Sequence, residues 1–173
     1  LSWYIKCLDV SRMEQDSVAM GKSYGNIGNI YYYLGDIPKV KQNFIKSLEI
    51  KEALNDSSGI AHTMGNMGNL YFDEGNYDSS VYYFNSGLTI FEGQENLFGM
   101  SLCLSSLGDV YREMGQFDQA EESLQKSIEF GQQVGDQHGI MRNYHTLAAI
   151  LYQRGKYNDA VVAYQKAIDM AHD

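Results

Sequence analysis

Four asparagines, arranged as two identically spaced pairs, are the residues best suited to recognising another molecule. Asn26 and Asn29 lie three residues apart, and the same pair recurs 40 residues later as Asn66 and Asn69. A side-chain amide both donates and accepts hydrogen bonds, as a peptide group does. Amides at this fixed interval favour a site that holds the backbone of an extended peptide without reading its side chains. The alternative is that these amides are solvated or bond neighbouring helices.

Residues near the asparagines supply aromatic surface and charge. Asp109 stands one repeat after Asn69, and we expect it to share the backbone-binding role. The residues that we expect to read the side chains of a bound peptide are Tyr33, Phe72, Arg112, Arg142 and Tyr152. This set mixes aromatic anchors with cations and lacks the basic cluster of a site that binds carboxylates alone.

Residue types that perform catalysis are present, but their spacing does not favour it. The four histidines form no HExxH motif, and no serine, cysteine or acid is visibly tied to them. Cys7 and Cys103 form no CxxC pair, so we expect neither a zinc site nor a disulfide framework. The segment GKSYGNIGN lacks the glycine spacing of a phosphate-binding loop. We therefore predict a protein that is not an enzyme and holds no metal or cofactor.

The charge of the chain narrows the class of partner. A net charge of -9 disfavours nucleic acid and an anionic membrane surface. No apolar run approaches the roughly 18 residues that can span a bilayer, so we expect no membrane insertion. We expect a protein or peptide partner and a cytoplasmic location.

Glycines at a constant interval show that the chain is built from repeated units. One column consists of Gly35, Gly75, Gly115 and Gly155, and a second of Gly28, Gly68, Gly108 and Ala148. Such self-similarity indicates a stack of like units. The second column falls inside predicted helices, where glycine costs about 1 kcal/mol relative to alanine. A cost repeated at one position indicates that a neighbouring helix approaches closely there.

Each unit contains two stretches with helical periodicity, so we expect antiparallel helix pairs. The predicted first helices are Val18–Leu34, Ile60–Glu74, Met100–Met114 and Ile140–Arg154. The predicted second helices are Ile37–Leu54, Tyr77–Glu92, Phe117–Val134 and Tyr157–Ala171, preceded by a lone helix at Leu1–Glu14. Polar loops are expected at 55–59, 92–96 and 135–139.

The units form one predicted array over residues 1–173. Residues 1–17 are interpreted as the second helix of a truncated repeat, followed by units 18–59, 60–99, 100–139 and 140–173. Neither end resembles the polar cap that a solenoid needs for solubility. We therefore expect the natural chain to continue on at least one side, and we expect that the uncapped ends can self-associate.

These columns resemble the tetratricopeptide repeat, a helix–turn–helix unit that is usually 34 residues long. The family's large residue, Leu-Gly pair and tyrosine are matched, for example, by Met64, Met67-Gly68 and Tyr71. The second-helix alanine and aromatic are matched by Ala120 or Ala160 and by Phe44, Phe84 and Tyr164. The usual proline is absent, and the 40-residue length is similar to the extended repeats of spindle-orientation scaffolds. The resemblance implies an all-α, right-handed solenoid whose first helices line a concave groove.

Together these observations predict an interaction scaffold that binds a peptide or helical segment in its groove. Two other interpretations stay open. Similar repeats occur in sensor regions of bacterial signalling proteins, including histidine kinases, so the chain could be a regulatory segment of such a protein. It could also be a module that assembles with itself through its ends.

Overall fold

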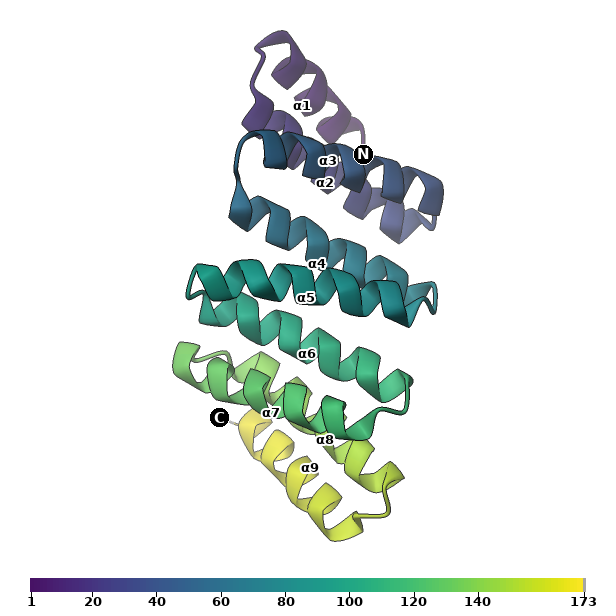
Figure 1. Cartoon of the computed structure of the whole chain (residues 1–173), viewed down its shortest axis with the longest axis vertical. Coiled ribbons are helices and arrows are strands. Elements are labelled where there is room, and N and C mark those ends of the chain that lie inside the picture. Colours follow the sequence, from purple (N-terminus) through teal and green to yellow (C-terminus); the bar gives the residue numbers. More distant parts are fainter. Residues whose placement is uncertain (173) are drawn as a thin grey trace.

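The computed structural model describes residues 1–172, whose regular structure consists of nine helices and no strand. The helices are α1 (Ser2–Met13), α2 (Ser17–Leu34), α3 (Ile37–Ala53), α4 (Ser57–Asp73), α5 (Tyr77–Gly93), α6 (Leu97–Glu113), α7 (Phe117–Val134), α8 (Gln137–Gln153) and α9 (Tyr157–His172). Consecutive helices pack against each other along the whole stack (Figure 1). The predicted all-α solenoid of helix pairs is confirmed.

The two kinds of helix occupy separate layers. In Figure 1 the second helices α3, α5 and α7 lie in front of the first helices. The first helices of successive units approach one another directly, from α2 to α4 to α6 to α8. Within the described residues, no two second helices do so. In a curved stack, the layer whose helices lie closer together is on the inside. The first helices are that layer, so they form the concave face.

Side-chain caps make the turns between units shorter than the sequence analysis predicted. The side chains of Asp56, Asn96 and Asp136 accept hydrogen bonds from backbone N–H groups three residues on, at 2.9–3.0 Å. Such a cap satisfies an otherwise unpaired donor at a helix start. The helices therefore begin at Ser57, Leu97 and Gln137. The predicted loops at 55–59 and 135–139 extended wrongly into the next helix, and the predicted loop at 92–96 began too early because α5 continues to Gly93.

The turn within each unit is built on glycine, as predicted. Gly75 has a φ of +71°, and Gly35, Gly115 and Gly155 have φ values of +71° to +75°. This left-handed conformation is costly for residues with a Cβ and commonly ends a helix. The glycine column therefore sets the sharp reversal from each first helix to its second helix.

At each mid-helix glycine of the second column, a large side chain from the second helix of the same unit packs against the first helix. A Cβ built on Gly28 would lie 2.6 Å from the ring of Phe44, and one on Gly68 would lie 2.8 Å from that of Phe84. A Cβ on Gly108 would lie 2.6 Å from Leu124 Cγ. The predicted close approach is confirmed, and its cause is a large side chain rather than bare backbone.

Two glycines of α4 give a direct test of this packing. We expect Gly68→Ala to destabilise the protein by up to about 2 kcal/mol, because overpacking costs about 1–3 kcal/mol and the better helix propensity returns about 1 kcal/mol. Gly65 has no atom within 4 Å of its potential Cβ, so Gly65→Ala should stabilise by up to about 1 kcal/mol. Urea unfolding followed by circular dichroism measures both. Equal stabilisation by the two variants would contradict the packing role of Gly68.

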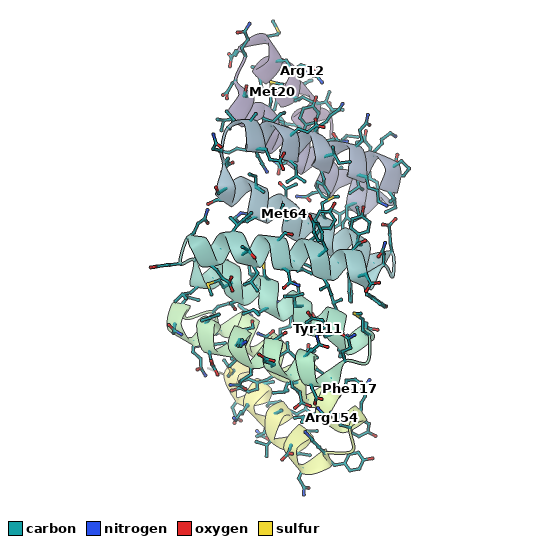
Figure 2. All side chains as sticks on the ribbon, in the orientation of Figure 1. Arg12, Met20, Met64, Tyr111, Phe117 and Arg154 are labelled. Carbon is teal, nitrogen blue, oxygen red and sulfur yellow. The ribbon has the colours of Figure 1, made fainter. Side chains whose placement is uncertain are left out.

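Polar contacts join neighbouring helices at both ends of the stack. At one end, Arg12 Nη2 donates to Tyr24 Oη at 2.6 Å. At the other, Arg154 follows the last residue of α8 and is labelled in Figure 2. Its Nη1 lies 2.7 Å from both Asp118 Oδ1 and Glu121 Oε1 of α7. Exposed apolar side chains remain on the end helices, including Trp3 on α1 and Val161 on α9. None of the helices in the described residues combines the length and apolarity needed to cross a membrane.

Candidate functional site

Three of the four predicted asparagines meet at one pocket on the concave face. Asn29 of α2 and Asn66 and Asn69 of α4 line a pocket of about 150 Å³, together with Tyr33. Asn26 lies one turn earlier on α2, is exposed, and does not line this pocket. The structure thus brings four of the predicted site residues together, from two successive first helices.

The four asparagine amides are not used to hold the fold. None of them forms a side-chain hydrogen bond with another protein group in the described part of the chain. All four side chains are half-buried or exposed. Their donors and acceptors therefore face solvent, where another molecule can reach them.

A second hollow of about 260 Å³ adjoins the first and shares Asn66 and Asn69 with it. Phe84 of α5 and Leu102 of α6 contribute apolar surface to this hollow. Arg142 of α8 supplies a charged group among its lining residues. The two hollows together extend over parts of α2, α4, α6 and α8, so one extended ligand could contact several units.

Asp109 and Arg142 lie where α6 meets α8, and hydrogen bonds hold each of them. Thr146 Oγ1 donates to Asp109 Oδ1 at 3.2 Å, and Arg142 Nη2 donates to Ser105 Oγ at 2.8 Å. Burial raises the pKa of the Asp109 carboxyl group, and the charges of Arg142 and Arg112 and the Thr146 hydrogen bond only partly oppose this effect. The surroundings of Asp109 therefore disfavour the charged form of its carboxyl group.

The raised pKa of Asp109 predicts a pH-dependent stability difference. Folding favours the protonated acid, so this group's contribution to stability is present below its unfolded pKa and is lost as pH rises through its folded pKa. We expect Asp109→Asn to raise the melting temperature at neutral pH. The advantage should shrink toward pH about 4, near the ordinary pKa of an aspartate. Thermal melts over this range measure it, and a difference that does not change with pH would refute the assignment.

Asp109 and three other predicted residues lie outside both hollows. Arg112 Nη2 pairs with Glu113 Oε1 at 2.7 Å. Phe72 is half-buried and packs against the core around Phe84. Tyr152 is exposed and packs edge-to-face on Tyr157, with ring centroids 5.3 Å apart. Their positions on the first helices were predicted, but neither hollow includes them.

Leu102 is a lining residue that the sequence analysis did not identify. It occupies the same repeat position as Lys22, His62 and Arg142. Its three counterparts are polar. Because binding residues were predicted from their residue types, the one apolar residue at this repeat position was not predicted. Reading the whole column by position would have found it.

A buried polar network that holds Arg142 was also missed. Ser105 Oγ, which accepts from Arg142, donates to Asn143 Oδ1 at 2.5 Å. Asn143 Nδ2 donates to Ser127 Oγ at 2.8 Å, and Ser127 Oγ donates to the Ser101 carbonyl at 2.7 Å. The network joins α6, α7 and α8 and, through Ser105, holds the guanidinium of the exposed Arg142. No single sequence column signals it, because its members come from three helices.

Reactive groups in the site are few. Burial raises the pKa of the Cys103 thiol to about 11, so the thiol stays protonated at neutral pH and is a poor nucleophile. Within the described residues, no three or more His, Cys, Asp or Glu side chains gather where a metal ion could bind. The arrangement offers hydrogen bonds, apolar surface and charge, which are means of binding.

Comparison with known proteins places these features in a family context. The sequence model of the tetratricopeptide repeat family matches residues 19–93 and 100–172. A search of curated protein sequences gave no match.

Solved structures show the same fold at low sequence identity. BtubC from P. vanneervenii superposes with a TM-score of 0.88 at 15% identity, over 99% of this chain and 71% of that one. The Rap conjugation gene regulator of plasmid pLS20, solved in complex with the Phr* peptide, gives 0.76 at 16%, over 92% of this chain and 44% of that one. A STAND protein with a tetratricopeptide repeat sensor from Pyrococcus horikoshii gives 0.81 at 21%, over 90% and 24%.

Proposed function

We propose, since this chain belongs to the tetratricopeptide repeat family, that its concave face binds an extended peptide segment of a partner protein. The observation that carries the proposal is the set of amides on successive first helices. Asn29, Asn66 and Asn69 line adjoining hollows and make no side-chain hydrogen bonds within the described part of the chain. They are available to bind another molecule without breaking an existing contact.

The chemistry of an amide suits the backbone of a peptide. An extended chain presents N–H and C=O groups in alternation, and each asparagine can pair with both. Main-chain hydrogen bonds then give affinity, while pockets for side chains give specificity. Asn66 and Asn69 border both hollows, so they would fix the register of the peptide across the boundary between them.

A structural neighbour supports a peptide as the ligand. The Rap conjugation gene regulator of pLS20 has the same fold and was solved with the Phr* peptide. Its identity to this chain is only 16%, so the likeness extends to the fold alone. We transfer the class of ligand, a peptide, and not its sequence.

A random peptide library provides the test. We would select dodecamers on the purified chain and measure the affinity of one selected peptide by fluorescence anisotropy. Asn66→Ala/Asn69→Ala should weaken binding about tenfold or more, because each lost hydrogen bond costs about 1 kcal/mol and 1.4 kcal/mol is tenfold. Far-UV circular dichroism should not change, since neither amide supports the fold.

Asn85→Ala is the matched control for this experiment. Asn85 is an exposed asparagine on the second helix α5 and lines neither hollow. We expect its replacement to leave the affinity unchanged. Equal affinity of the double variant and the wild type, or a library that yields no binder, would overturn the proposed function.

A further inference from the structure

The hollow that α4, α5 and α6 form beside Arg142 has an apolar interior and a cationic edge, and we infer that it selects one side chain of the ligand. We propose that it takes a leucine-, methionine- or phenylalanine-sized side chain of a bound peptide, with a neighbouring acidic residue of the same peptide held by Arg142. This inference rests on the proposed function and specifies its ligand.

The interior of this hollow is suited to an apolar group. Phe84 and Phe91 of α5 are almost fully buried, yet both contribute to its lining. Leu102 forms part of the lining and keeps 38% of its surface exposed. With a volume of about 260 Å³, the hollow can hold one large side chain. A ligand that covers Leu102 removes its exposed apolar surface from water, which favours a group that buries carbon there.

The edge of the hollow is suited to a carboxylate. The chain has a net charge of -9, yet no Asp or Glu is among the residues that line this hollow. Arg142 is exposed and forms no ion pair within the described part of the chain. A guanidinium carries five N–H donors and matches a carboxylate in two-bond geometry.

The position of Arg142 is fixed before a ligand arrives. Its Nη2 donates to Ser105 Oγ, which the buried Asn143 holds in turn. Asp109 is a nearby acid, but its carboxylate accepts from Thr146 and makes no ion pair with the guanidinium. The remaining donors of Arg142 are therefore free for a peptide carboxylate.

Selection from the same random dodecamer library separates the two halves of the inference. Wild-type protein should enrich peptides in which Asp or Glu lies close to Leu, Met or Phe. Arg142→Met keeps the aliphatic stem and removes the charge, so the acidic enrichment should fall about tenfold, as expected for a hydrogen-bonded charge. Ser106→Phe places a ring in the hollow, because Ser106 is one of its lining residues, and should abolish the apolar preference.

Lys22→Met is the matched control, since Lys22 is an exposed cation at the same repeat position on α2 and does not line the hollow. It should leave the selected sequences unchanged. Wild-type sequences without a paired acid and apolar residue, or an acidic preference that survives Arg142→Met, would overturn the inference. If Asn66→Ala/Asn69→Ala still weakens binding in that case, the proposed function stands alone. A library that yields no binder overturns both.

Discussion

Phe84→Ala is expected to lower the free energy of unfolding by about 3–5 kcal/mol, the usual cost of removing a buried aromatic ring. Phe84 is 3% exposed and fills the space that Gly68 leaves open on α4. It also packs in one core with Leu107 and Val110 of α6. The ring therefore joins the two helices of its own unit to the first helix of the next. Urea unfolding monitored by circular dichroism measures the loss.

The fourth unit supplies the control for this substitution. Tyr164 occupies the same repeat position as Phe84, but it is 38% exposed, and its unit has Ala148 at the position that Gly68 occupies in the second unit. Tyr164→Ala should cost about 1–2 kcal/mol, because only part of this side chain leaves water on folding. Similar losses for the two variants would show that the packing position does not determine the stability of this stack.

Asn143→Ala is expected to cost about 2–4 kcal/mol. Asn143 is 1% exposed and bonds both Ser105 Oγ and Ser127 Oγ. Truncation removes two hydrogen bonds, each worth about 0.5–1.5 kcal/mol, and leaves a cavity that adds to the cost. Chemical unfolding gives the stability. Because Ser105 also holds Arg142, we expect the variant to bind acidic peptides more weakly even where it remains folded.

Asn158→Ala separates this effect from the loss of any asparagine. Asn158 is exposed on α9 and makes no side-chain hydrogen bond within the described residues. Its replacement should change stability by no more than about 0.5 kcal/mol, as for most surface substitutions. If Asn143→Ala were equally mild, the buried network would not be a structural element of this protein.

The fold could be predicted from sequence because each unit repeats the same local rules. The units have glycine at the turn, glycine opposite a large side chain, and apolar residues at helical spacing. These features occur in register, and all of them indicate a pair of helices. The predicted helix starts were three residues too late at Ser57, Leu97 and Gln137. The polar segments before them were interpreted as loops, although Asp56 and Asp136 are cap residues and the next residues are helical.

The site could be predicted only in part. Asn29, Asn66 and Asn69 were found because they repeat, and Tyr33 because it lies near them. Phe72 lies outside both hollows, because its position on the first helix packs it partly against the core around Phe84. Leu102, Ser105 and Asn143 could not be selected by chemistry alone. Their roles depend on which side chains of α4, α5, α6, α7 and α8 meet, and the packing of these helices determines that.

Photo-crosslinking locates the bound peptide directly. Benzoylphenylalanine would replace Tyr33, which lines the asparagine pocket and is 86% exposed, or Tyr82, which is 64% exposed on the second helix α5. Each protein would be irradiated with a library-selected peptide and analysed by mass spectrometry. We expect crosslinks from position 33 and none from position 82. Crosslinks from position 82 alone would place the peptide on the opposite layer and contradict binding in the concave groove.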